Sequence, residues 1–405
     1  MRIFTAIRHA LDPALFHGGL WSANFYPALR GLGHEIVESQ VDLAPASRFM
    51  GVASEFTSEE LALRSQITER VVDEVRAAHR QRRVDLFLAY FYRSHFDPSA
   101  FTDIRALGIP SINFFCNSVY QFPLVAEVAR AVDWSWHAER DARDSYLQAG
   151  ARPVWVQMGA DPCVYRPVTV ETRRQAACFV GQRYADRDQL AASLIEAGVP
   201  VDLYGSGWSA TPATETSGDR EIYLGRAIHD PGTSGAYVRL AESTLTEHGL
   251  VDGARRLVRR MNHRRSSRAA AELCASAAKG TVPPGKIAET FSSYELCLNF
   301  SNVWSDGEPG SPLVPHVRLR DFEGPMSRSC YLTGHSDEIA EFYAIGQEID
   351  TYRDAGELVD KSRFYLANPD AAERLRHAGF QRATRDHTWT RRFEALFATA
   401  GLTPA

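Results

Sequence analysis

The sequence predicts an α/β protein of two facing Rossmann-like domains, each a parallel sheet covered by helices. Three observations support this fold class. The 405 residues exceed one ordinary core and suit two domains of ~150 to 200 residues. Short apolar runs alternate with helix-period segments up to residue 160. After a segment without helical period, 159–170, the same alternation restarts, so we interpret this segment as a crossover between domains.

In the first half, the expected helices are 58–79 and 137–148, where apolar residues recur at helical spacing. The expected strands are short apolar runs between helical segments, at 2–7, 34–41, 84–90, 111–115, 131–136 and 153–157.

The second half repeats this pattern, with a long and mostly helical stretch, 235–280, that we interpret as an insertion. The expected strands are 177–180, 200–204, 294–300 and 330–333, and the expected helices are 186–197, 355–367, 370–385 and 390–400. We therefore expect an N-terminal domain over 1–165, a C-terminal domain over 166–388 and a last helix within 389–405, which the family resemblance described below implies returns to the first domain.

Composition narrows the function classes. Hydrophobic residues at 44% and charged residues at 23% are ordinary globular values. A net charge of -5 disfavours a surface built for nucleic acid, and no nucleic-acid partner is expected. The six cysteines form no metal or Cys-x-x-Cys pattern, so we expect reduced thiols. No signal-peptide pattern follows Met1, and the longest apolar run, 86–92, is far below the ~20 residues of a membrane span, so we expect a cytoplasmic protein with at most peripheral membrane contact.

The most informative segment follows a loop rich in glycine and proline, 306–315. A helix starting there presents free N–H groups, which favour phosphate. Arg318 and Arg320 can neutralise a diphosphate, and Glu323, one turn after Arg320, can accept hydrogen bonds from both ribose hydroxyls. The alternative is a surface helix with an ordinary Arg–Glu pair.

A second candidate segment surrounds two strand ends. Gly181 ends one strand and lets backbone approach a ligand, and Arg183 on the next loop is a candidate phosphate ligand. Tyr204 and Gly205, with Trp208 beyond them, form a flexible aromatic turn that suits a flat base. The alternative for the aromatic residues is burial between sheet and helix.

These two segments closely resemble the glycosyltransferases related to the spore maturation protein CgeB, of the group 1 type. The resemblance rests on the order and spacing of several motifs, which are Phe179-Val180-Gly181, Arg320-Asp321-Phe322-Glu323, Tyr352-Arg353-Asp354 and His387-Thr388. It implies the GT-B fold, with a nucleotide-sugar-binding C-terminal domain and an acceptor-side N-terminal domain. It also implies that Glu323 binds the donor ribose. Many relatives carry another glutamate eight residues earlier, where this chain has Pro315, and the neighbouring His316 is our substitute candidate.

The first half offers weaker candidates. Gly18 and Gly19 follow the first strand, and a double glycine lets backbone N–H groups reach a phosphate or sugar, although a plain turn is the alternative. His95, after the strand 84–90, and His17, beside the double glycine, are the candidate catalytic residues, because a neutral imidazole can deprotonate an acceptor hydroxyl. An unremarkable loop histidine is the alternative for His95.

The insertion contains an arginine-rich segment, Arg255–Arg268. Helical spacing places Arg256, Arg260, Arg264 and Arg268 on one face. Acidic neighbours, phospholipid head groups or an anionic acceptor can each neutralise such a stripe, and a solvated face is the simpler alternative.

We therefore predict a hexosyltransferase-like enzyme that moves a sugar from a UDP-, GDP- or TDP-linked donor to a hydroxyl of an acceptor. No Asp-x-Asp motif with a supporting set of metal ligands appears at a strand end to hold a diphosphate through a cation, so we expect a metal-independent enzyme without a cofactor. The resemblance of Glu323 to the ribose-binding glutamate of retaining relatives favours retention of the anomeric configuration. A nucleotide-sugar epimerase and a non-catalytic nucleotide-sugar-binding protein are the alternatives.

Overall fold

A computed structural model describes residues 1–10, 16–52, 55–208 and 234–402. Within these ranges the chain divides into two compact units. The first contains residues 1–157, 234–257 and 392–402, and the second contains residues 158–208 and 258–391.

The first unit is built on a six-stranded sheet in the order β2-β1-β3-β4-β5-β6, in which all neighbouring strands are parallel. All six predicted strands are present, as β1 (Arg2–Ala6), β2 (Glu35–Glu38), β3 (Leu86–Ala89), β4 (Ser111–Phe115), β5 (Trp134–His137) and β6 (Pro153–Trp155). The strand expected from residue 131 begins later, because Ala131 ends a helix.

Helices of the first unit follow the predicted alternation. The helix at 58 begins where expected, because Thr57 and Glu60 form a capping box in which each side chain accepts the other's backbone N–H. The helix expected from His137 begins only after residue 139, because His137 is the last residue of β5. The helical segments are α1 (Phe16–Gly31), α2 (Ala44–Ser47), α3 (Ser58–Gln81), η1 (Pro98–Ala100), α4 (Phe101–Ala106), α5 (Ser118–Gln121), η2 (Phe122–Leu124), α6 (Ala126–Ala131), η3 (Arg140–Ala142) and α7 (Arg143–Gln148).

Aromatic side chains fill the core of this unit. The ring of Phe25 in α1 lies 5.2 Å from that of Trp136 in β5. Phe393, from the last helix α16 (Trp389–Ala400), lies 5.2 Å from Phe25 and 5.6 Å from Trp136. The C-terminal helix is therefore packed into the core of the first unit through α1 and β5.

The second unit is built on a parallel sheet in the order β13-β12-β9-β7-β8. Because β8 and β9 lie on opposite sides of β7, the winding direction reverses between β7 and β9. Ligands of such sheets bind beyond the carboxyl ends of the strands at this switch point. The strands are β7 (Arg174–Val180), β8 (Val201–Tyr204), β9 (Tyr294–Asn299), β12 (Tyr331–Gly334) and β13 (Asp350–Tyr352), and a separate antiparallel pair is β10 (Val303–Trp304) and β11 (Leu313–Val314).

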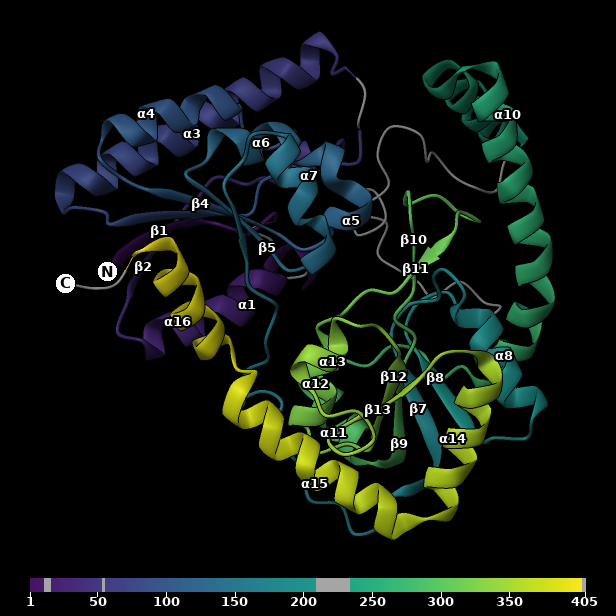
Figure 1. Cartoon of the computed structure of the whole chain (residues 1–405). Helices are drawn as coiled ribbons and strands as arrows, with labels where there is room; N and C mark the ends of the chain where they lie inside the picture. Colours follow the sequence, from purple (N-terminus) through teal and green to yellow (C-terminus); the bar gives the residue numbers. More distant parts are fainter. Residues whose placement is uncertain (11–15, 53–54, 209–233, 403–405) are drawn as a thin grey trace. The chain divides into compact units, whose positions relative to one another are not determined.

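Helices cover both faces of this second sheet, as the lower part of Figure 1 shows. One face carries α8 (Arg187–Glu196) and α14 (Ala355–Ala367). The other carries α11 (Ile287–Ser292), α12 (Arg320–Met326) and α15 (Pro369–Asp386). Shorter segments are η4 (Ala275–Ala277), η5 (Pro284–Lys286) and α13 (Ile339–Phe342).

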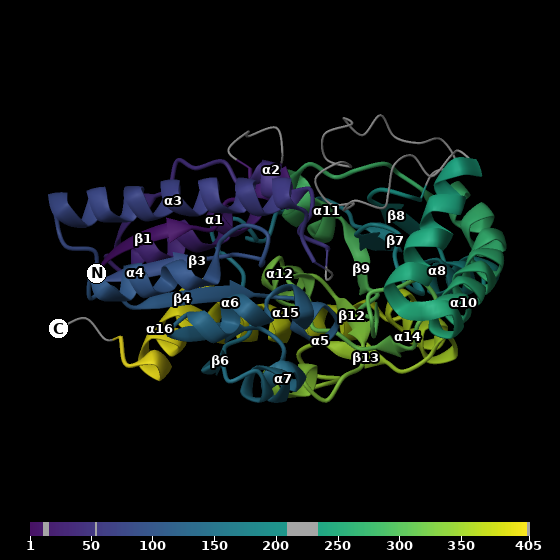
Figure 2. The same cartoon turned by 90° about the horizontal axis from the view of Figure 1, so that it is seen from above.

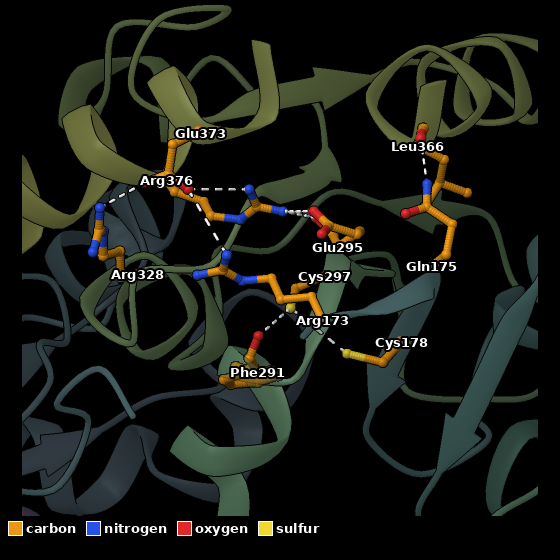
Figure 3. A network of polar contacts seen from close by, with 10 residues as sticks. All are labelled: Arg173, Gln175, Cys178, Phe291, Glu295, Cys297, Arg328, Leu366, Glu373 and Arg376. Atoms are coloured by element: carbon orange, nitrogen blue, oxygen red, sulfur yellow. Dashed lines mark hydrogen bonds and ion pairs between the residues drawn. The ribbon is translucent and has the colours of Figure 1, made fainter. Parts of the chain in front are cut away.

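A charged network fastens α15 to the sheet (Figure 3). Arg376 of α15 is 2% exposed and pairs with Glu295 of β9. It also pairs with Glu373, at an N···O distance of 3.3 Å. Glu373 also accepts from Arg328 at 2.5 Å. Deeper in the sheet, the thiols of Cys178 and Cys297 lie 3.6 Å apart on neighbouring strands. All six cysteines are free thiols, as expected.

Two segments of the second unit, one around Ala160 and the other around His387 to Trp389, run side by side and are hydrogen-bonded to each other. The Ala160 N–H donates to the His387 carbonyl at 3.0 Å, and the Trp389 N–H donates to the Ala160 carbonyl at 3.2 Å. Gly159 permits this approach, because a Cβ there would lie 2.9 Å from the backbone at Thr388 and Trp389. The predicted crossover segment therefore pairs with the segment that leads into α16.

The insertion forms the helix α10 (Ser234–Cys274), drawn in teal-green in Figure 2, with a kink at Gly249 (φ 76°). Arg259 pairs with Asp306 at 2.8 Å and Arg260 pairs with Glu308, so α10 packs on the loop between β10 and β11. The expected arginine stripe does not share one environment, because Arg260 is half-buried whereas Arg268 is exposed. A four-residue repeat drifts around a helix of 3.6 residues per turn.

Among the described residues, no helix is both long enough and apolar enough to cross a bilayer.

Candidate functional site

Two arginines lie at the carboxyl ends of β7 and β9 in the second unit. Arg187, the first residue of α8, donates through Nε to the Phe300 carbonyl at 3.1 Å and through Nη1 to the Gln182 carbonyl at 2.8 Å. Arg320 donates through Nε to the Val180 carbonyl at 3.4 Å. These two guanidinium groups therefore lie at the switch point of the sheet, where parallel α/β sheets bind ligands.

A third guanidinium, that of Arg318, lies near Arg187. Burial and, next, the charge of Arg318 lower the pKa of the Arg187 guanidinium to about 9. In the described part of the chain, Nε and Nη2 of Arg318 are buried and form no hydrogen bond. Neither arginine forms an ion pair with another described residue. Two like charges in a largely buried corner are costly even though the carboxylate of Asp186 offsets part of the charge at Arg187, so this corner of the unit suits an anion.

Asp321 fixes the backbone that carries Arg318. Its carboxylate accepts from the Arg318 N–H at 2.6 Å, from Thr333 at 2.8 Å, from Asn299 at 3.1 Å and from Tyr331 at 3.2 Å. Burial raises the pKa of Asp321, and these four hydrogen bonds counter the rise. The loop before α12 is therefore held to β9 and β12 at the level of Arg318.

Glu323 is fully buried, at 0% exposed, and its Oε2 pairs with Arg320. The other oxygen, Oε1, is buried without a hydrogen-bond partner in the described part of the chain. Tyr165 lies beside this pair, and its pKa is raised by burial and by the Glu323 charge. The Arg–Glu pair of the surface-helix alternative is thus present, but its glutamate is buried and not on the surface, and one carboxylate oxygen still has acceptor capacity.

Part of the expected helix N-terminus is already hydrogen-bonded within the chain. The N–H groups of Asp321 and Phe322 donate at 3.0 Å to the carbonyls of Arg318 and Leu319. The Arg318 N–H donates to Asp321. A tight turn ahead of α12 uses these three donors, so the arginine side chains are the main groups that can meet an anion.

The loops after β7 and β8 interlock at two glycines. The Gly181 N–H donates to the Tyr204 carbonyl at 2.8 Å, and the Trp208 indole donates to the Gly181 carbonyl at 2.7 Å. Gly205 has φ +127°, and a Cβ there would lie 2.3 Å from the Gly181 carbonyl oxygen. Trp208 is 2% exposed, so the structure supports the alternative in which this aromatic side chain belongs to the core.

We expect Gly205→Ala to destabilise the protein by about 1 to 3 kcal/mol, because an L-residue at this φ is strained and its Cβ meets backbone. Thermal or urea unfolding measures the loss. Gly198→Ala is the matched control, since Gly198 also has positive φ but a Cβ there has nothing within 4 Å. An equal loss in both variants would leave backbone strain as the whole cause and remove the role of the interlock.

Other predicted donor residues are partly engaged within the second unit. Arg183, 34% exposed, lies 3.4 Å from Asp188 and donates to the Gly207 carbonyl at 3.3 Å. The Tyr204 hydroxyl lies 2.7 Å from that of Tyr294, which donates to Asp202. His316 is buried two residues before Arg318.

The candidate site residues of the first unit lie in positions that suit contact with a ligand less well. Both ring nitrogens of the fully buried His95 are bonded, Nδ1 to the Tyr92 N–H at 3.1 Å and Nε2 to the Ser47 hydroxyl at 2.9 Å. Gly18 and Gly19 lie in the first turn of α1 and not in a loop, because that helix begins at Phe16. The side chain of His17 lies outside the described residues.

Sequence reasoning passed over His9, three residues beyond the end of β1. Its Nε2 lies 2.7 Å from the Tyr90 carbonyl, which can only accept, so Nε2 carries the proton and Nδ1 keeps a lone pair. Burial lowers the pKa of His9 to about 4. The order of the first sheet reverses between β1 and β3, so His9 lies at that sheet's switch point. The signal in the sequence that could have identified His9 was its position three residues after the first strand.

Comparisons with known proteins follow the two-sheet architecture. No curated protein matches the chain in sequence. Sucrose-phosphate synthase from Thermosynechococcus elongatus is similar over 98% of this chain and 100% of its own, with a TM-score of 0.55 and 13% identity. The HepE protein of Anabaena, solved with UDP, is similar over 100% of both chains, with a TM-score of 0.55 and 11% identity.

A glycosyltransferase from Rickettsia africae is similar over 98% of this chain and 97% of its own, with a TM-score of 0.56 and 8% identity. In sequence, residues 251–398 match the family described as glycosyl transferase-like. At these identities the structural likeness concerns the fold. The chain thus has the GT-B glycosyltransferase fold predicted for it, with a C-terminal segment similar in sequence to the glycosyl transferase-like family.

Proposed function

We propose that this protein is a glycosyltransferase that takes its sugar from a nucleotide-sugar donor bound in the second unit. The observation that carries the proposal is the pair of like charges near the carboxyl ends of β7 and β9, where Arg187 is buried and Arg318 holds two buried nitrogens without a hydrogen bond among the described residues. A diphosphate supplies the missing counter-charge at the place where such sheets bind nucleotides. The match of residues 251–398 to the glycosyl transferase-like family supports the same assignment.

In this proposal each group of the site has one task. Arg187 and Arg318 stabilise the diphosphate as the bond from its oxygen to the anomeric carbon breaks and the acceptor oxygen bonds to that carbon, and the proton of the acceptor hydroxyl passes to the departing diphosphate oxygen. Glu323 accepts hydrogen bonds from the ribose through Oε1, while the ion pair with Arg320 holds the carboxylate in place. UDP is the first donor nucleotide to test, because HepE of Anabaena was solved with UDP and with UDP and glucose.

The acceptor side of the proposal rests on the first unit. The lone pair on Nδ1 of the neutral His9 accepts a hydrogen bond from the acceptor hydroxyl and orients its oxygen. A pKa near 4 suits orientation better than full proton removal at neutral pH. We also propose that the protein is related to the transferases that resemble CgeB. The acceptor itself is identified by the acceptor panel described next.

A direct test is calorimetric titration of UDP, GDP and TDP, followed by incubation of the matching nucleotide-sugars with an acceptor panel. We expect micromolar to millimolar binding of one diphosphate and acceptor-dependent sugar transfer that survives chelation by EDTA, because arginines take the role of a cation. An absolute requirement for added magnesium or manganese would contradict this account. Epimer formation without acceptor would favour an epimerase, and binding without turnover would favour a non-catalytic binding protein.

A further inference from the structure

The outward side of α10 carries large apolar side chains that the fold leaves exposed. Val258 and Met261 are 56% and 55% exposed, and Leu250 and Val251 are 78% and 65% exposed. Val251, Val258 and Met261 are seven and three residues apart, so they share one side of the helix. Soluble proteins rarely align several such side chains in contact with water unless a partner covers them.

The opposite side of the helix is already used. Ser267 donates to the buried Asp188, and the Cys274 thiol donates to the Asp188 carbonyl at 3.5 Å. His263 packs edge-on against Trp304, with ring centroids 5.3 Å apart. The exposed apolar side chains therefore do not serve the packing of α10 on the second unit.

The exposed side is also positively charged. Residues 250–274 contain seven arginines and two acidic residues, Asp252 and Glu272. Of these arginines, Arg259 and Arg260 are turned to acidic partners of the β10–β11 loop. Arg255 and Arg268 are more than three-quarters exposed and form ion pairs only within the helix, with Asp252 at 3.2 Å and Glu272 at 3.3 Å. Such exposed pairs are weak, and Arg265 is exposed and pairs with no other described residue.

We propose that this side of α10, residues 250–273, docks on the surface of an anionic phospholipid membrane. The helix lies in the plane of the interface over about 36 Å, with its apolar side chains at the acyl boundary and its arginines at the phosphates. A second copy of the chain fits less well, because two such faces would bring arginines against arginines. The apolar side chains stand on the ridge of a single helix flanked by arginines, which matches a flat anionic surface.

Vesicle co-sedimentation tests this proposal with the full-length protein. We expect binding to vesicles with about one third phosphatidylglycerol in phosphatidylcholine, and at least a tenfold weaker partition to phosphatidylcholine alone. Binding to the anionic vesicles should fall as salt is raised. Equal binding to both kinds of vesicle, or none to the anionic ones, would overturn the proposal, the latter leaving an acidic macromolecule as the partner.

Two double variants separate the apolar and the charged contributions. Val258→Asp with Met261→Asp, and Arg265→Glu with Arg268→Glu, should each lower the partition coefficient by about tenfold or more. Phe364→Asp on α14, 50% exposed in the wild type, and Arg83→Glu, whose side chain is 78% exposed, are the matched controls and should bind as wild type. Melting curves verify folding, and wild-type partition by both double variants would contradict the assignment to α10.

Discussion

Arg318→Ala is expected to weaken binding of the preferred nucleoside diphosphate by about a hundredfold and to leave the free protein as stable as before, or slightly more stable. The loss follows from removing a charge-assisted contact to phosphate, which is worth about 1.5 to 3 kcal/mol. The unchanged or raised stability follows because the buried guanidinium lacks a counter-ion and repels Arg187. Binding sites commonly hold such costly groups in place for the ligand.

Calorimetric titration of the diphosphate and of the corresponding nucleoside, beside a melting curve, measures both effects. Nucleoside binding should change by less than about threefold, since the nucleoside carries no phosphate. Arg183→Ala is the matched control, because Arg183 is already paired with Asp188 and should contribute less. Equal losses for diphosphate and nucleoside, or a clear drop in melting temperature with unchanged affinity, would show that Arg318 has a structural role.

Local sequence patterns predicted the strands and helices well, because each is set by nearby residues. Alternating apolar runs located all six strands of the first sheet, and the helix predicted at 355–367 coincides with α14. The start of α1 was missed, since two glycines favour a loop locally. Packing of the following aromatic residues Trp21 and Phe25 into the core accounts for the longer helix.

The candidate site could be predicted only in part, because side-chain burial depends on which strands become neighbours. Arg318, Arg320 and Glu323 follow from spacing and from a family resemblance. Arg187 joins them only because β9 lies beside β7, which places the Phe300 carbonyl within its reach. His95 shows the reverse case: its loop position predicted access to a ligand, whereas Ser47, 48 residues away in sequence, occupies one of its nitrogens.

The last prediction concerns Glu323, whose burial changes what its substitution must do. Glu323→Gln removes the charge opposite Arg320 inside the unit, and breaking a buried ion pair typically costs 3 to 5 kcal/mol of stability. A loss of affinity alone would therefore not separate a ribose contact from partial unfolding. The ratio of a variant's affinities for two ligands does separate a ribose contact from partial unfolding, because both titrations use the same folded population.

The wild type should bind the ribonucleoside diphosphate about ten- to a hundredfold more tightly than its 2′-deoxy analogue, since Oε1 of Glu323 accepts from the ribose hydroxyls. In Glu323→Gln this ratio should fall below about threefold, because the amide offers a weaker, neutral acceptor. Tyr165→Phe keeps the ion pair and is the control, with a ratio near that of the wild type. Calorimetry at a temperature well below the melting point of each protein gives the six affinities, two for each of the three proteins. A ratio in Glu323→Gln equal to that of the wild type would end the ribose assignment and leave Glu323 as the structural partner of Arg320.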